Sequence, residues 1–209
     1  MLLYYITDRS QFPGGENERR KALLVKIAKS ACAGVDYIQL REKDLGGRDL
    51  ERWAREGIHR VRASGASTKL LINSRTDIAL AIEADGVHLR SNDISPAEVR
   101  KIWRQANASR DPIIAVSCHF EAEVIAAERS GADFVVFGPV FEKQGSPDSQ
   151  IAGLEPLRSA CRHKIPVLAL GGLTPENAKS AVAAGARGVA GIRLFQEGDV
   201  KATIEKLRS

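Results

Sequence analysis

The chain has 209 residues, 44% of them hydrophobic and 27% charged, and this ordinary globular composition excludes a disordered or fibrous protein. The net charge of +5 is modest, lysines and arginines are spread along helical segments, and aromatic residues make up only 5% of the chain, so no nucleic-acid-binding surface is expected. Cys32, Cys118 and Cys161 are too few and too widely spaced for a disulfide framework or a zinc site, which favours the reducing cytoplasm.

Short runs rich in β-branched and aromatic residues alternate with helix-like segments along the whole chain. Strands are expected at residues 2–7, 35–40, 69–73, 86–89, 113–117, 134–137, 166–170 and 188–192. Helices are expected at residues 18–33, 47–63, 76–83, 95–105, 121–130, 154–161, 175–184 and 200–207. This alternation predicts a parallel sheet.

Eight strand–helix units in about 200 residues match a small (β/α)8 TIM barrel, so we expect residues 1–209 to form one such domain. A doubly wound sheet fits less well, because no Gly-x-Gly-x-x-Gly follows the first strand. The opening apolar run is far shorter than a secretory leader, and no stretch approaches the roughly 20 apolar residues of a membrane span. We therefore expect no membrane partner.

Barrel enzymes carry their chemistry at the carboxyl ends of the strands, so the strand ends nominate candidate ligand contacts. They are Thr7, Asp8, Gln39, Arg41, Lys43, Asn73, Ser74, Arg75, His88, Ser117, His119, Gly138, Pro139, Gly171, Gly172, Ile192 and Arg193. This set is polar, cationic and glycine-rich, which predicts a small-molecule ligand that bears phosphate.

Gln39, Arg41 and Lys43 are spaced two residues apart at the end of the second strand. Side chains alternate between the faces of a strand, so these three point the same way and form a cationic pocket wall suited to phosphate. The simpler interpretation is an exposed strand end with solvated charges.

Two glycines follow the seventh strand, before a helix with Thr174 as its N-cap and Pro175 at its first position. Backbone amides at Gly171 and Gly172 suit phosphate, which barrels commonly hold in the loops after strands seven and eight. A tight turn alone would also require glycine.

Asn73 and Asp93 follow neighbouring strands and supply an amide and a carboxylate that a magnesium ion could use together with ligand phosphates. Asp93 could equally cap the helix that follows it. His119 is a candidate proton shuttle, because imidazole titrates near neutrality, although a lone histidine is more often a structural hydrogen-bonding group.

Several motifs together resemble the thiamine phosphate synthase family and its close relative, thiazole tautomerase. They are residues 5–8 (YITD), 39–43 (QLREK), 71–79 (LINSRTDIA), 85–89 (DGVHL), 116–119 (VSCH), 137–141 (FGPVF) and 170–172 (LGG), in the order of the family. The resemblance covers nearly the whole chain, and QLREK is its most specific part.

The synthases of this family join a hydroxymethylpyrimidine pyrophosphate to a thiazole phosphate, and the resemblance implies a role for each matching residue. Arg41, Lys43 and Asn73 would hold pyrophosphate, Gln39 and Ser117 would lie near the pyrimidine, Asp93 would bind Mg²⁺, and Gly172, Ile192 and Arg193 would meet the thiazole phosphate. Oligomeric state is not predicted, and a homo-oligomer is compatible with these features.

Three positions depart from the synthase pattern. Ser74 stands where synthases carry a second magnesium carboxylate, residues 142–146 replace a Thr-x-Thr-Lys loop, and Arg193 replaces a serine. These departures favour the tautomerase, whose proton-moving histidine matches His119, whereas Asp93 favours the synthase. We expect a thiamine phosphate synthase-like transferase, with thiazole tautomerase and a non-catalytic binder of thiazole or thiamine phosphate as the alternatives.

Overall fold

The computed structural model describes residues 1–142 and 151–209, and its eight parallel strands close into a barrel in which β1 pairs with both β2 and β8. The strands are β1 (Leu2–Ile6), β2 (Tyr37–Leu40), β3 (Lys69–Asn73), β4 (Gly86–Leu89), β5 (Ile113–Cys118), β6 (Phe134–Phe137), β7 (Val167–Leu170) and β8 (Gly188–Gly191). The predicted TIM barrel is confirmed.

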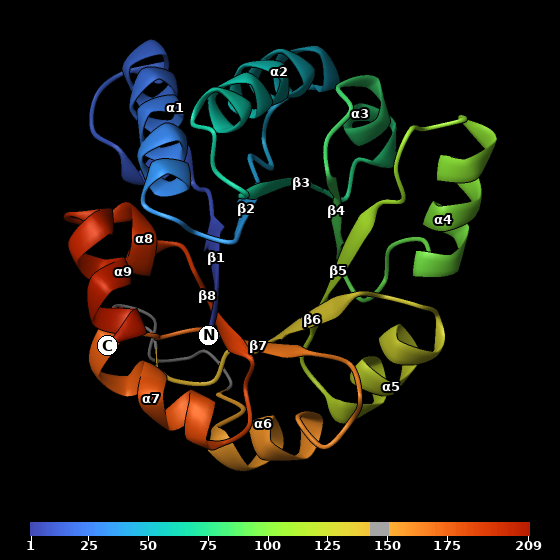
Figure 1. Ribbon diagram of the computed structural model, residues 1–209, viewed down its shortest axis with the longest axis vertical. Helices are drawn as coiled ribbons and strands as arrows, with labels where there is room; N and C mark the ends of the chain where they lie inside the picture. Colours follow the sequence, from blue (N-terminus) through green and yellow to red (C-terminus); the bar gives the residue numbers. More distant parts are fainter. Residues whose placement is uncertain (143–150) are drawn as a thin grey trace.

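Helices surround the strands on all sides, with α9 beside α1 and α7 (Figure 1). The helical segments are η1 (Arg9–Gln11), α1 (Glu16–Cys32), α2 (Gly47–Ala63), α3 (Thr76–Ala81), α4 (Pro96–Gln105), α5 (Glu121–Arg129), α6 (Leu154–Ala160), α7 (Pro175–Ala183), α8 (Arg193–Gln196) and α9 (Val200–Arg208). The sequence did not predict η1 and α8, because segments this short carry no periodic pattern.

The core has two layers, as expected when strands bury both faces. The barrel interior is filled by the side chains of Tyr4, Ile6, Leu71, Ala115, Phe134, Val136, Leu168 and Ala190. A larger apolar layer, which includes Leu23, Ile27, Trp53 and Val99, joins the strands to the helices. The interior packing closes the barrel below its carboxyl end and leaves the polar strand ends above it.

Predicted element boundaries differ from the observed ones by one or two residues. The second strand begins at Tyr37 and not at Val35, because Gly34, with φ +89°, turns the chain there. Thr174 caps α7 as predicted, with its side chain accepting a hydrogen bond from the Asn177 amide.

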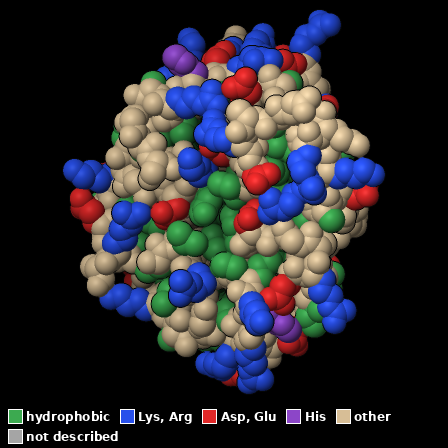
Figure 2. Space-filling model, turned by 45° about the vertical axis from the view of Figure 1, so that its right-hand side comes forward, with side chains coloured by type: hydrophobic (Ala, Val, Ile, Leu, Met, Phe, Trp, Pro, Cys, Tyr) green, Lys and Arg blue, Asp and Glu red, His purple; other side chains and the backbone are tan. Residues whose placement is uncertain are grey.

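The surface carries charges of both signs. Figure 2 shows Lys and Arg side chains interspersed with Asp and Glu over one face, around a hollow that exposes hydrophobic side chains. Within the described parts of the chain, no helix combines the length and the apolar character that crossing a membrane requires.

Candidate functional site

A cationic cluster formed by Arg41, Lys43 and Arg90 lies at the carboxyl ends of β2 and β4. Burial lowers the pKa of Arg41, and the nearby Arg41 charge, followed by burial and the Arg90 charge, lowers the pKa of Lys43. Because the Arg41 and Arg90 charges both act on Lys43, the three cations share one region, which an anion would stabilise. Among the acids, Asp8 is close enough to counter Arg41 and Lys43 in part.

An ion-pair brace fixes the loop that carries Arg41 and Lys43. Glu42 is buried and accepts hydrogen bonds from the Thr7 hydroxyl at 2.6 Å and from the backbone amide and guanidinium of Arg9, both at 3.1 Å. The same guanidinium donates to both carboxylate oxygens of Asp44, each at 2.7 Å. The brace therefore fixes Glu42 and Asp44, the immediate neighbours of Arg41 and Lys43 in the chain.

Gln39 and Asn73 are joined across β2 and β3. The Gln39 amide nitrogen donates to the Asn73 side-chain oxygen at 2.8 Å, so the ends of these neighbouring strands are joined. The Gln39 side-chain oxygen is buried and accepts no hydrogen bond within residues 1–142 and 151–209. A ligand with an N–H donor would satisfy it.

A hydrogen-bonded chain of Tyr4, His88 and Ser117 crosses the barrel interior. The Tyr4 hydroxyl lies 2.9 Å from His88 Nδ1, and His88 Nε2 lies 2.7 Å from Ser117 Oγ. Burial, followed by the Arg41 charge, lowers the pKa of His88 to about 3, so the ring is neutral. The buried Tyr4 hydroxyl donates its proton to His88 Nδ1. The neutral ring therefore carries its own proton on Nε2, which donates to Ser117 Oγ. The Ser117 hydroxyl is thus left to donate to a ligand.

His119 lies at the same end of the barrel, directly after β5. Its Nδ1 is 2.6 Å from the Gly138 carbonyl oxygen, which can only accept, so Nδ1 carries the proton. Nε2 then holds the lone pair in an exposed ring. This arrangement suits a base.

The loop after β7 is built from backbone. Gly171 and Gly172 have φ values of +99° and +59°, and a Cβ on Gly172 would stand 2.3 Å from the Glu142 carbonyl oxygen. Only glycine fits this close approach. The Asn177 side chain donates to the Gly172 carbonyl at 2.9 Å and fixes the loop against α7.

Ile192 and Arg193 lead into the short helix α8, beside the glycine loop. The buried Gln196 holds α8 to the end of β1, because its side chain accepts from the Tyr5 hydroxyl at 2.9 Å and donates to the Asp8 carbonyl at 2.6 Å. Arg193 is exposed, with its Nε 3.9 Å from Glu197. Of the altered 142–146 loop, residues 143–146 lie outside the described residues.

Asp93 has its carboxylate fully engaged. One oxygen accepts from the Ser74 hydroxyl at 2.6 Å and the Arg90 amide at 2.8 Å, and the other accepts from Arg90 Nε at 3.1 Å and Nη2 at 2.9 Å. Burial would raise its pKa, but these hydrogen bonds outweigh burial and hold the pKa below its ordinary value. Ser95, and not Asp93, caps α4.

This donor set does not fit a resident magnesium ion. It offers one carboxylate, whose oxygens are already hydrogen-bonded, beside a guanidinium that repels a dication. In residues 1–142 and 151–209 no three His, Cys, Asp or Glu side chains are grouped to hold a metal. The magnesium role of Asp93 stays a prediction from the resemblance, and its surroundings speak against it.

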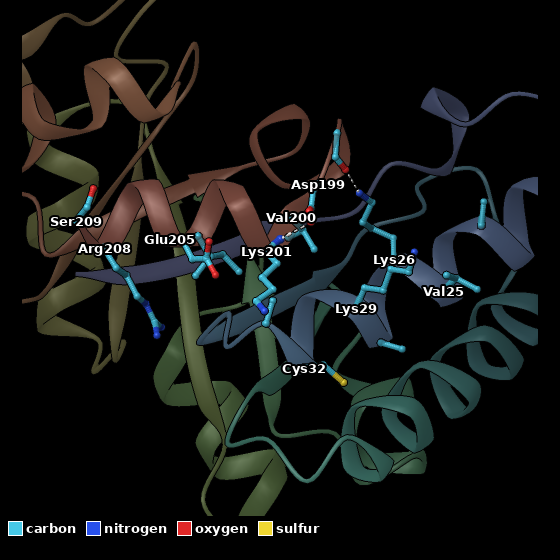
Figure 3. A pocket seen from close by; sticks show the side chains of 15 residues that line it. Val25, Lys26, Lys29, Cys32, Asp199, Val200, Lys201, Glu205, Arg208 and Ser209 are labelled. Carbon is cyan, nitrogen blue, oxygen red and sulfur yellow. Dashed lines mark hydrogen bonds between the residues drawn. The ribbon is translucent and has the colours of Figure 1, made fainter.

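A groove and a smaller cavity lie between neighbouring helices of the outer layer. A groove of about 1260 Å³ runs along the outer surface between α1 and α9, where Lys26 donates to the Gly198 carbonyl (Figure 3). A smaller cavity of about 400 Å³ lies between α4 and α5 and adjoins Asp93. The groove contains none of the candidate strand-end residues, and the cavity contains Arg90 and Asp93 but not Gln39, Arg41, Lys43 or Asn73, so the barrel mouth remains the candidate site.

Comparisons with known proteins agree with this geometry. A family model described as thiamine monophosphate synthase matches residues 3–195. The chain belongs to the thiamine monophosphate synthase family.

Individual relatives cover nearly the whole chain. A putative thiamine-phosphate synthase 2 from Aquifex aeolicus is 41% identical over 93% of this chain and 97% of its own length. A thiamine-phosphate synthase from Syntrophomonas wolfei is 36% identical over 99% of this chain and 94% of its own. The structure of a thiamine phosphate pyrophosphorylase from Pyrococcus furiosus superposes with a TM-score of 0.80 at 30% identity, covering 99% of this chain and 93% of that one.

Within this member of the thiamine monophosphate synthase family, sequence reasoning missed Arg90 and Tyr4 and nominated His88 only as one of the strand-end contacts, without its link to Ser117. Arg90 follows a strand end by one residue, which was a usable signal. Tyr4 lies inside a strand and reaches His88, 84 residues away, only because the barrel closes.

Proposed function

We propose that this protein is a thiamine phosphate synthase, a transferase that joins hydroxymethylpyrimidine pyrophosphate to thiazole phosphate and releases pyrophosphate. The observation that carries the proposal is the cationic cluster of Arg41, Lys43 and Arg90 beside the Gln39–Asn73 pair. Family membership supports the same activity.

Pyrophosphate is a polyanion that the cationic cluster would stabilise. Burial lowers the pKa of Arg41, and the Arg41 charge, followed by burial and the Arg90 charge, lowers the pKa of Lys43, so an arriving anion relieves a repulsion at Lys43 that the free protein maintains. Charge-assisted hydrogen bonds from these side chains strengthen further as negative charge develops on a departing pyrophosphate.

The adjoining polar side chains suit an aminopyrimidine. The buried Gln39 oxygen accepts from an exocyclic amino group, and the Ser117 hydroxyl donates to a ring nitrogen because His88 donates to it. Both contacts orient the ring so that its methylene carbon faces the cavity mouth.

The opposite side of the mouth suits the second substrate. Backbone at Gly171 and Gly172, with the loop at Ile192 and Arg193, forms the kind of phosphate site that barrels build after strands seven and eight. The thiazole phosphate held there would direct its ring nitrogen toward the pyrimidine methylene.

The reaction then needs positioning and charge stabilisation. The bond between the methylene carbon and the pyrophosphate oxygen breaks, and its electron pair leaves with pyrophosphate. The electron-rich pyrimidine carries the resulting cation until the thiazole nitrogen lone pair forms the new C–N bond. The protein adds no covalent intermediate.

The direct test supplies both substrates to purified protein and measures thiamine phosphate and released pyrophosphate. We expect turnover that falls roughly 30- to 100-fold in kcat/KM in Arg41→Ala, because a charge-assisted contact is lost. Arg129→Ala is the matched control, since this exposed arginine ends α5 at the far end of the barrel. Absence of product with wild-type protein would overturn the proposal and favour a non-catalytic binder.

One observation favours thiazole tautomerase as a second candidate. The Gly138 carbonyl fixes the proton of His119 on Nδ1, which leaves Nε2 as a base at the barrel mouth. If this is the activity, carboxythiazole phosphate tautomers interconvert with wild-type protein and not with His119→Ala. A synthase instead retains most of its turnover in His119→Ala, because no step of that reaction requires this base.

A further inference from the structure

We infer that the Arg90 guanidinium, anchored on Asp93, binds the pyrophosphate directly and supplies at this position the positive charge that a magnesium ion would otherwise bring. The inference deepens the proposed function and rests on it. It assigns a further catalytic residue and makes pyrophosphate binding independent of magnesium.

The contacts of Asp93 define a built anchor for Arg90. Ser74 donates to one carboxylate oxygen at 2.6 Å, and Arg90 Nε and Nη2 donate to the other at 3.1 and 2.9 Å. The Asp93 side chain is 11% exposed and that of Arg90 is 62% exposed, so the acid is held in place while the guanidinium is open to solvent. Arg90 Nη1 and the second proton of Nη2 are therefore available to an anion.

Arg90 also lies close to the other cations. Its charge lowers the pKa of Lys43, and Lys43 is itself beside Arg41. A planar guanidinium matches phosphate oxygens in a bidentate way, and the flanking lysine adds a point charge. The three side chains come from two strand ends and could contact one pyrophosphate from two sides.

Charge balance explains why Ser74 suits this arrangement. A single carboxylate neutralises a single guanidinium, whereas a second acid at position 74 would leave an excess negative charge that attracts a dication. The Ser74 hydroxyl keeps the hydrogen bond to Asp93 without adding charge. Ser74 adopts φ +57°, a conformation that its short polar side chain stabilises by this contact.

The test is calorimetric binding of inorganic pyrophosphate to the full chain in the presence of EDTA. We expect wild-type protein to bind under these conditions and Arg90→Gln to bind at least roughly tenfold more weakly, because a hydrogen-bonded charge is lost. Arg90→Lys should fall between them, since it keeps the charge and loses the planar fork. Urea unfolding of each variant checks that the exposed substitution leaves the fold intact.

Arg52→Gln is the matched control. Arg52 pairs with Asp49 at 2.8 Å, also three residues away and exposed, so its loss changes the net charge equally. Pyrophosphate affinity that is equal in Arg90→Gln and Arg52→Gln would overturn the inference.

Asp93→Asn distinguishes pyrophosphate binding by the Arg90 guanidinium from binding through magnesium. If Arg90 contacts the pyrophosphate, losing the competing carboxylate keeps or tightens binding in EDTA. If wild-type protein binds only after magnesium is added, and Asp93→Asn loses that gain, the inference is wrong while the proposed function stands. If pyrophosphate binds under neither condition, both fall.

Discussion

The two sides of the barrel mouth present different kinds of groups to the space between them. At the ends of β2 and β4 the contacts are charged side chains, whereas after β7 they are backbone groups at Gly171 and Gly172. Side chains can be exchanged one at a time, but a backbone site depends on how closely two loops approach. The charged side is therefore the easier of the two to alter by single substitutions.

The charged side depends most on Arg9, so its removal should give the largest effect. Arg9→Ala leaves Glu42, whose side chain is only 2% exposed, buried without its cation. Breaking a buried ion pair from one side costs about 3 to 5 kcal/mol, and we expect this loss in the free energy of unfolding measured with urea.

Arg20 provides a control for Arg9. Both guanidinium groups lie over the Trp53 ring, at 5.3 Å for Arg9 and 5.8 Å for Arg20, but Arg20 pairs with the partly exposed Glu56. Arg20→Ala should cost about 1 kcal/mol or less. Equal losses for the two variants would show that ring contact, and not the buried acid, gives Arg9 its importance.

The backbone side should be most sensitive at Gly172. Gly172→Ala places a Cβ 2.3 Å from the Glu142 carbonyl oxygen and 2.6 Å from that of Phe141, in a left-handed conformation. Strain of about 1 to 2 kcal/mol and overpacking of about 1 to 3 kcal/mol should lower the free energy of unfolding. The affinity for thiazole phosphate should fall as well.

Gly65 separates the two contributions at Gly172. It has a similar φ of +67°, but a Cβ there meets nothing within 4 Å. Gly65→Ala should therefore show the conformational cost alone, with unchanged affinity for thiazole phosphate. If Gly65→Ala lowers the free energy of unfolding as much as Gly172→Ala does, the contact of the new Cβ with the Glu142 carbonyl does not explain the effect at Gly172.

The difference between backbone groups and charged side chains also determines how much of the site the sequence could predict. The backbone site was predictable, because Gly171 and Gly172 lie between a strand and a capped helix, and Gln39 and Asn73 meet because parallel strands end together. Arg90 is one of 31 Lys and Arg residues, and its place one residue after a strand end is a weak signal by itself. Its place beside Asp93 and Lys43 depends on how the loop after β4 folds.

The third and smallest expected effect on stability is at His88. It tests the hydrogen-bonded series Tyr4–His88–Ser117 in the barrel interior. Its pKa is lowered from 6.5 to about 3 by burial and by Arg41. At pH 5 the unfolded chain binds a proton at His88 and the folded protein does not, so stability falls as the pH drops below 6.5. Over 1.5 pH units this loss is roughly 2 kcal/mol.

The measurement compares urea unfolding at pH 7 and pH 5 for wild-type protein and His88→Gln. Glutamine can bridge Tyr4 and Ser117 without titrating, so the variant should lose about 2 kcal/mol less between the two pH values. Identical pH dependence in both proteins would mean that His88 accepts a proton in the folded state. Nδ1 would then donate to the Tyr4 hydroxyl, so the direction of that hydrogen bond would be the reverse of the one assigned, while Nε2 would still donate to Ser117.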